Sequence, residues 1–308
     1  MDNLGRFSAL LAVVRQKVFI SFVAMLMGMG GAWAQGHLAI SEVLFQPRSG
    51  EAEYVELYNP TDGAVELGQY HIVRWINDTV GSHYTLPQYS VAAHDYVVLT
   101  RNAASVEANY DVRYKDKVVE CGLPPYPNDG GRVVLTLADS TIIESFVYTP
   151  DLHSRLLRNR AGVSLERRSF EEDVNAAGNW FSAASTAGYG TPGYANSQSS
   201  EWIAEEASFV MEETIVSPDG DGYQDELTLT YTLDNGETYG SIEIYDAMGN
   251  RVRQLLNSAL LGTHGEVRWD GKGENGRALH TGRYVMIITL YDTVGTRQVI
   301  KRAVTLAN

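Results

Sequence analysis

Cysteine is nearly absent from this sequence. Cys121 is the only cysteine in 308 residues, so no intramolecular disulfide can form. No histidine or second cysteine lies near it at the spacing of metal ligands, which argues against a zinc or redox site. We expect Cys121 to act as a small buried hydrophobic side chain.

Basic residues are scarce relative to acidic ones. The chain holds 24 Lys and Arg against 38 Asp and Glu, which gives a formal net charge of −14 at pH 7. Nucleic acids reward basic patches that neutralise phosphates, so this balance argues against a nucleic-acid partner. An acidic surface of this kind mainly favours solubility.

Familiar catalytic signatures are also missing. The seven histidines show no HxH or HExxH spacing, and no GxSxG motif occurs. The Gly-rich stretch 270–276 contains Lys272 but lacks the Ser or Thr and the following helix of a phosphate-binding loop, so we interpret it as a turn. The sequence therefore predicts no enzyme. The alternative is an extracytoplasmic hydrolase or nuclease accessory whose cryptic site is assembled from distant loops.

Only one apolar run is long enough to consider for a membrane, and it lies at the N-terminus. Arg6, Arg15 and Lys17 precede apolar residues 18–29, and Ala32-Trp-Ala34 has the small-x-small form of a signal peptidase site. The run is shorter than the roughly 20 residues that span a bilayer, which disfavours a retained anchor. We therefore predict a cleavable signal peptide over residues 1–34, no transmembrane helix in the mature chain, and an extracytoplasmic protein that is secreted, cell-surface or periplasmic.

Long helical patterns are absent, and short alternating strands take their place. In Tyr54–Tyr58, Val55 and Leu57 face one side, while Tyr54, Glu56 and Tyr58 face the other. Glu53 and Glu56 then lie on opposite faces, which makes them a poor acid/base pair. Without a helix to serve as a crossover, antiparallel sheets packed as a sandwich are expected. The fold class is all-β, with two immunoglobulin-like β-sandwich domains after the signal peptide.

Several motifs in residues 35–196 resemble the lamin tail domain in its bacterial form. The residues that carry this resemblance are Ile40-Ser-Glu-Val43, Glu53–Pro60, Gly162–Arg167, Asn179-Trp180 and Gly190-Thr-Pro-Gly193. The resemblance implies an immunoglobulin-like sandwich known mainly as a binding or scaffolding module, with no catalytic residues to carry over. From the residues alone, we expect Glu166, which is followed by Arg167 and Arg168, to form a local ion pair at a strand edge.

Residues 197–213 are predicted to be a linker, flexible over a short span, and residues 214–308 a second sandwich. This second part resembles the immunoglobulin-like domain named after the flagellar hook-capping protein FlgD. The residues that carry the resemblance are Ser217–Gly222, Ile244–Asp246, Gly249, Arg251-Val252, Trp269–Gly271, Asn275-Gly276 and Gly282–Tyr284. Similar domains end many secreted bacterial proteins, and related ones serve as sorting signals for type IX secretion. The resemblance thus implies the secretion machinery as a partner.

The stretch Ser217–Glu226 is rich in carboxylates and glycines. Tight turns at the glycines let carboxylates at alternating positions converge, as a loop that binds a hard cation requires. The predicted ligands of a calcium ion are Asp219, Asp221 and Asp225. The alternative is a solvated loop in which the aspartates form Asx-turns and cap the entry to a strand.

Taken together, these patterns predict a secreted or cell-surface, non-enzymatic protein. Its first domain is expected to bind or scaffold an unknown protein or surface glycan. Its C-terminal domain is expected to support export, anchoring or assembly.

Overall fold

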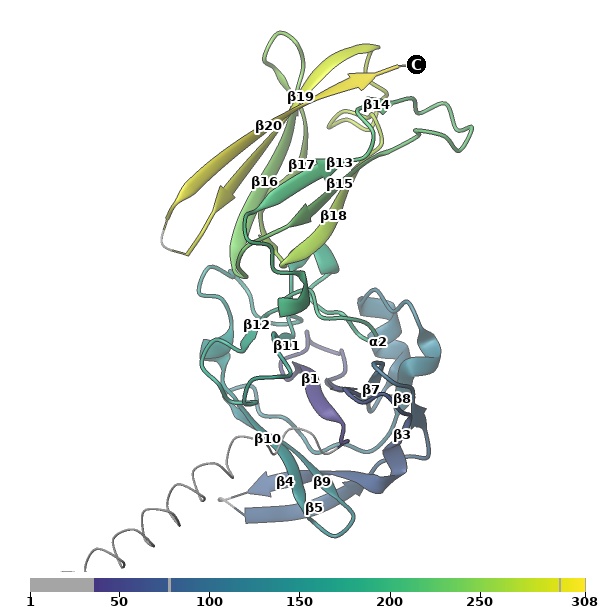
Figure 1. The fold of residues 1–308 in the computed structure, drawn as a ribbon, viewed down its shortest axis with the longest axis vertical. Helices are drawn as coiled ribbons and strands as arrows, with labels where there is room; N and C mark the ends of the chain where they lie inside the picture. The colour runs from purple at the N-terminus through teal and green to yellow at the C-terminus, as the bar shows by residue number, and fades with distance from the viewer. Residues whose placement is uncertain (1–35, 77–78, 294, 308) are drawn as a thin grey trace, which may run out of the picture. The chain divides into compact units, whose positions relative to one another are not determined.

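The computed structural model describes residues 36–76, 79–293 and 295–307, and the predicted signal peptide lies outside these residues. His37–Asn308 forms one compact unit that contains two β-sandwiches (Figure 1). The predicted all-β fold class is confirmed. In the described ranges, no helix is long and apolar enough to cross a membrane.

The first sandwich packs a six-stranded sheet against a four-stranded sheet. The six-stranded sheet has the order β12-β11-β1-β2-β7-β8, and the four-stranded sheet has the order β10-β9-β4-β5. A small β3-β6 pair accompanies them. The strands are β1 (Ala39–Leu44), β2 (Tyr54–Tyr58), β3 (Val65–Glu66), β4 (Tyr70–Ile76), β5 (Thr79–Thr85), β6 (Ser90–Val91), β7 (Tyr96–Thr100), β8 (Val118–Glu120), β9 (Gly131–Leu137), β10 (Ile142–Tyr148), β11 (Leu165–Arg167) and β12 (Trp180–Ser182).

Helical segments in the described chain are short. The α-helix is α2 (Ala103–Asn109), and the 3-10 turns are η2 (Leu67–Gln69), η3 (Lys115–Lys117), η4 (Pro150–Leu152), η5 (Ser185–Ala187) and η6 (Ser200–Trp202). Asn102 caps α2, because its side-chain oxygen accepts a hydrogen bond from the Ser105 backbone N–H at 3.1 Å.

The six-stranded sheet is covered on both of its faces. Val55 and Leu57 point into the main core between the two sheets, where Phe146 and Trp180 stack at 3.7 Å. On the other face, Tyr54 packs in a second apolar cluster with Val106 of α2. The predicted alternation of β2 is confirmed. Because both faces of β1 and β2 are covered, polar side chains on the second face are taken out of water, and they require partners there.

The second sandwich packs a three-stranded sheet against a five-stranded sheet. Their orders are β13-β15-β18 and β14-β20-β19-β16-β17. The strands are β13 (Ser208–Met211), β14 (Ile215–Val216), β15 (Leu227–Thr232), β16 (Thr238–Tyr245), β17 (Arg251–Leu261), β18 (His264–Trp269), β19 (Gly282–Tyr291) and β20 (Arg297–Leu306). Strand β15 alternates buried residues with half-exposed threonines, as a strand does when one face meets a core and the other meets solvent.

The segment predicted to be a linker is only partly free of regular structure. Ser197 and Gln198 donate hydrogen bonds to the buried Glu166 of the first sandwich, at 2.7 and 3.0 Å. Ser208–Met211 forms β13, which pairs with β15 of the second sandwich. The structure therefore places the first strand of the second sandwich before residue 214. The sequence did not predict this strand because it has only four residues. That is too few for the inward-facing Phe209 to belong to a recognisable alternation.

Candidate functional site

Three glutamates lie side by side on the second face of the six-stranded sheet. Glu42 of β1 is the register partner of both Glu166 on β11 and Glu56 on β2. All three side chains are fully buried. We call Glu42, Glu56 and Glu166 the carboxylate cluster. No Lys or Arg of the described chain pairs with any of the three.

The segment that follows β12 and η5 supplies hydrogen bonds to all three members of this cluster. The Thr191 hydroxyl lies 2.8 Å from Glu166 Oε1 and 3.2 Å from Glu42 Oε2. The backbone N–H of Gly193 donates to Glu56 Oε2 at 2.7 Å. One hydroxyl has a single proton to donate, so Thr191 satisfies both carboxyl groups only when one of them carries a proton that Thr191 can accept. The geometry thus favours a shared proton.

Glu42 is the most heavily hydrogen-bonded member of the cluster. Its Oε1 accepts a hydrogen bond from the Tyr54 hydroxyl at 2.6 Å and from the Ser164 hydroxyl. The Thr191 backbone N–H donates to it at 3.1 Å. In contrast, Oε1 of Glu56 is buried and has no hydrogen-bond partner in the described part of the molecule. Glu56 is therefore the member that is best suited to hold a proton.

Burial sets the protonation of the cluster. Desolvation raises the pKa of Glu42 above its usual range, although its hydrogen bonds oppose the shift. Desolvation, followed by repulsion from Glu42, raises the pKa of Glu166 to about 8. The same two causes raise the pKa of Glu56 well above its usual value. Chemically, the cluster can hold protons at neutral pH and fasten the segment of residues 191–198 to the sheet.

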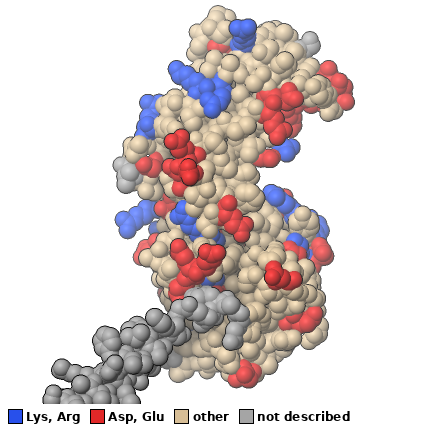
Figure 2. Space-filling view, in the orientation of Figure 1, with Lys and Arg blue, Asp and Glu red and all other residues tan. Residues whose placement is uncertain are grey.

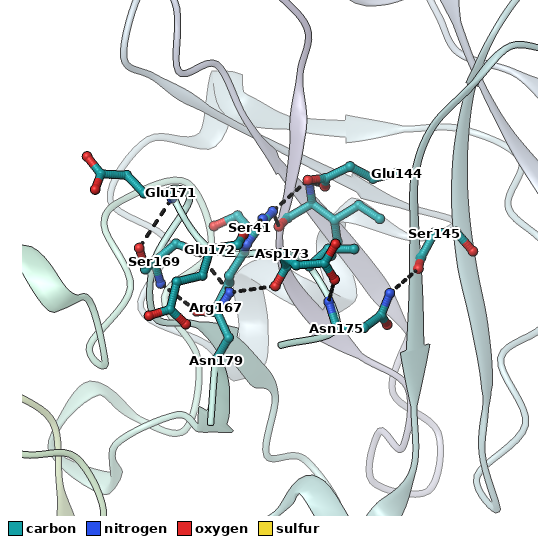
Figure 3. A network of polar contacts seen from close by, with 12 residues as sticks. Ser41, Glu144, Ser145, Arg167, Ser169, Glu171, Glu172, Asp173, Asn175 and Asn179 are labelled. Atoms are coloured by element: carbon teal, nitrogen blue, oxygen red, sulfur yellow. Dashed lines mark hydrogen bonds and ion pairs between the residues drawn. The ribbon is translucent and has the colours of Figure 1, made fainter. Parts of the chain in front are cut away.

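A buried ion pair lies next to the cluster in sequence but connects the two sheets instead (Figure 3). Arg167 Nη1 donates to Glu144 Oε1 at 2.8 Å, with both side chains buried. Glu144 Oε2 accepts the backbone N–H of Ile40 at 2.7 Å. The prediction of a local Glu166–Arg167 ion pair at a strand edge is wrong. Adjacent strand residues point to opposite faces, so Arg167 reaches β10 while Glu166 joins the cluster.

The guanidinium of Arg167 uses its remaining donors on backbone carbonyls. Its Nε donates to the Ser169 carbonyl at 3.1 Å, and its Nη2 donates to the Glu172 carbonyl at 2.9 Å. Asn179 braces the same turn through hydrogen bonds to the Ser169 backbone. Figure 3 shows Arg167 between Glu144 and the turn after β11 that holds Ser169 and Glu172. These acceptors hold the guanidinium of Arg167 in place and compensate for its removal from water.

In the second sandwich, the structure brings together the three aspartates that were predicted to bind a cation. One carboxylate oxygen from each of Asp219, Asp221 and Asp225 lies within 4.8 Å of the others. The carboxylate of Asp225 also accepts the backbone N–H groups of Gly220 and Gly222, at 2.7 and 2.9 Å. Hard cations prefer such oxygen ligands, and the Asx-type hydrogen bonds of the alternative are present as well.

Two comparisons with family models match separate parts of the chain. Residues 32–150 match the Lamin Tail Domain, and residues 210–305 match the CHU_C Type IX secretion signal domain. The second match is thus to a secretion signal domain, and the likeness to the FlgD domain stays a prediction. A search of curated proteins found no match.

Solved structures give weaker likenesses. CopC from Methylosinus trichosporium OB3b is 21% identical, with 27% of this chain and 74% of CopC covered at a TM-score of 0.18. PorU from Porphyromonas gingivalis is 10% identical, with 88% and 20% covered at a TM-score of 0.27. PorZ from the same organism is 12% identical, with 88% and 39% covered at 0.24. The chain spans well under half of PorU and of PorZ, and none of these likenesses carries an argument about function.

The class of protein follows from the fold and the family matches. The chain is an all-β protein with two immunoglobulin-like sandwiches, a lamin tail match in the first and a type IX secretion signal match in the second. The secretion signal match indicates an extracytoplasmic protein, secreted or at the cell surface.

Proposed function

We propose that this chain is a secreted or cell-surface, non-enzymatic protein whose first sandwich binds or scaffolds a partner. Its second sandwich is the signal that directs the chain to the type IX secretion machinery. The observation that carries the proposal is the secretion signal match over residues 210–305, which coincides with a sandwich that has its own apolar core. In the first sandwich, the buried carboxylates bond to the protein's own backbone and hydroxyl groups, which supports a structural role for them.

Export can be tested by removing the second sandwich. In a bacterium with a type IX system, the full chain is expected at the cell surface, and a form that ends at Ala204 is expected in the periplasm. The stop at Ala204 keeps Ser197 and Gln198, which bond to Glu166. Cell fractionation, protease access on intact cells and intact mass give the readout, and the mass reports whether the second sandwich is removed.

A reporter protein provides the control for misfolding of the shortened chain. The reporter with the signal peptide and residues 205–308 is expected at the surface, and the same reporter with only the signal peptide in the periplasm. If both chains and both reporters share one compartment, the second sandwich is a binding module instead of an export signal.

Calcium is proposed as the ion of the Asp219 loop. If the loop binds calcium with a dissociation constant near 0.1 mM, about 1 mM calcium stabilises the second sandwich by roughly 1.4 kcal/mol. Thermal unfolding with calcium, with magnesium and with a chelator measures the effect. Asp221→Asn removes one negative charge of the three and is expected to abolish most of it. An unchanged melting temperature in calcium would leave only the Asx-turn interpretation of this loop.

A further inference from the structure

A hollow of about 700 Å³ lies beside the loop of residues 154–163, within the unit His37–Asn308. Its lining contains two arginines and no Asp or Glu, although the chain as a whole carries 38 acidic residues against 24 basic ones. Figure 2 shows acidic and basic side chains interspersed over the face in view. Arginines are thus the only charged residues in the lining of this hollow, which makes it a local exception to the acidic charge of the protein. The lining residues used below are Arg48, Arg158, Asn159, Tyr189, Tyr239 and Tyr291.

The arginines of the neighbouring loop lack partners inside the protein. Arg155, Arg158 and Arg160 occur within six residues, and none of their side chains makes a hydrogen bond or ion pair among the described residues. Arg155 and Arg158 are exposed. Arg48 pairs with Glu51 at 3.4 Å, but 43% of its side chain is exposed and its remaining donors are available. An arginine has five N–H donors, so this group of side chains can offer a fork of donors to an anion.

Tyrosines supply the second half of the recognition chemistry. Tyr189, Tyr239 and Tyr291 line the hollow together with the Asn159 amide. Tyr239 is buried, and its hydroxyl lies 2.8 Å from the buried Ser154 Oγ, so Tyr189 and Tyr291 are the rings that a ligand can reach. Aromatic rings provide flat apolar surface with a polar tip, and amides provide both donors and acceptors. Flat rings beside hydrogen-bonding groups suit a sugar ring, which has apolar C–H faces and a rim of hydroxyls.

We propose that this hollow binds an acidic saccharide, meaning a sugar unit that carries a carboxylate or a phosphate. The arginines would bind the anionic group, and Tyr189, Tyr291 and Asn159 would bind the ring. This inference rests on the binding role proposed above and names the class of its partner. A nucleic acid is disfavoured as the source of the anion, because a net charge of −14 repels a long polyanion beyond the hollow.

The test uses the mature full-length chain and isothermal titration calorimetry with defined probes. The probes are an oligomer of galacturonic acid, glucose 6-phosphate, a neutral glucose oligomer of the same length, inorganic phosphate and a short polyglutamate peptide. At least one acidic sugar is expected to bind, at least tenfold more tightly than the neutral oligomer, inorganic phosphate and the peptide, and more weakly as salt is added. The preferred acidic sugar tells carboxylate from phosphate.

Arg158→Gln removes a guanidinium from the hollow and is expected to weaken binding roughly tenfold to hundredfold, since charge-assisted hydrogen bonds are lost. Arg158→Lys keeps the positive charge but loses the paired N–H donors of the guanidinium. Its affinity is expected to lie between that of the wild type and that of Arg158→Gln. Arg74→Gln is the matched control, an exposed arginine outside the lining, and is expected to bind like the wild type. Because Arg158 is exposed, the melting temperature of its variants should not change.

Three results would overturn the inference. They are equal binding of the acidic and neutral sugars, wild-type affinity in Arg158→Gln, and binding of only the peptide or no probe up to about 10 mM. Export of Arg158→Gln is measured alongside by surface protease access. The variant is expected to reach the surface normally. A failure of sugar binding would therefore leave the export proposal standing, and a failure of export in the wild type would leave the binding proposal standing.

Discussion

Raising the pH from 4.5 to about 8 is expected to lower the free energy of unfolding of the first sandwich. The cause is the carboxylate cluster, whose members hold protons in the folded state because burial raises their pKa values, that of Glu166 to about 8. In the unfolded chain, the same groups lose their protons near pH 4.5. Each proton that only the folded state retains costs about 1.4 kcal/mol of stability per pH unit.

The direction of the effect follows from which state binds more protons. A carboxyl group with a raised folded pKa stabilises the fold fully below its unfolded pKa, and this contribution is lost as the pH rises through the folded value. One buried group opposes the trend. Burial lowers the pKa of His153 to about 4, so it destabilises the fold as the pH falls below 6.5. Glu56 and Glu166 alone outnumber this imidazole between pH 4.5 and 6.5, and above 6.5 only the carboxyl groups contribute.

Amide hydrogen exchange of β1 and β11 across this pH range, corrected for the intrinsic exchange rate, measures the stability of the first sandwich. Glu56→Gln is the informative variant, because Gln is neutral at every pH and can still accept the hydrogen bond from Gly193. It is expected to flatten the pH dependence and to stabilise the sandwich at the upper end of the range. Glu171→Gln, at an exposed position of the same sandwich, is the control and should leave the slope unchanged.

Stability that rises between pH 4.5 and 8, or an unchanged slope in Glu56→Gln, would contradict this account of the cluster. The first result would mean that the three glutamates are ionised in the folded protein. The second would mean that Glu56 retains no proton in the folded state and that Glu42 and Glu166 account for the slope.

Arg167→Met is expected to destabilise the first sandwich by about 3–5 kcal/mol. The Arg167 and Glu144 side chains are 0% and 8% exposed, so removing the guanidinium leaves a buried carboxylate without its counter-charge. Adding Glu144→Gln should recover part of the loss, because Gln removes the charge and can still accept the Ile40 N–H. The stability of the first sandwich in both variants is measured by urea unfolding of the mature chain. Amide hydrogen exchange in peptides from β1 and β10 reports the unfolding of this sandwich.

An exposed ion pair in the same sandwich provides the comparison. Lys115 and Glu107 lie 2.7 Å apart, and 72% of the Lys115 side chain is exposed. Lys115→Met is expected to change stability by less than about 1 kcal/mol, because solvent screens an exposed pair. Equal losses in Arg167→Met and Lys115→Met would show that the buried network contributes no more than a surface contact.

Local patterns in the sequence predicted the parts of the structure that depend on neighbouring residues. The alternation of Tyr54–Tyr58 predicted which residues face the main core. The spacing of Asp219, Asp221 and Asp225 predicted that their carboxylates converge. In both cases the interacting residues lie within a few positions of each other, so strand and turn geometry fixes their arrangement.

The carboxylate cluster could not be predicted in the same way. Glu42 and Glu166 are 124 positions apart, and they meet only because β1 pairs with β11 in one register. Each glutamate alone resembled an ordinary solvent-facing residue of a half-buried strand. The missing information was that the segment around Thr191 and Gly193 covers this face of the sheet. One signal was present, since each glutamate lies in a motif that carries the lamin tail resemblance.

The hydrogen bonds that close the first sandwich also constrain when it can finish folding. Ser41 and Asn196 bond to each other across 155 positions, and Thr191 reaches Glu42 across 149. While the chain is being made, β1 and β2 emerge early, and their glutamates stay hydrated. The sandwich can complete its polar face only after residue 198 is free, so its final step is a long-range closure, which is intrinsically slow. Until then, the charge on this face helps to keep the unfinished domain soluble and open.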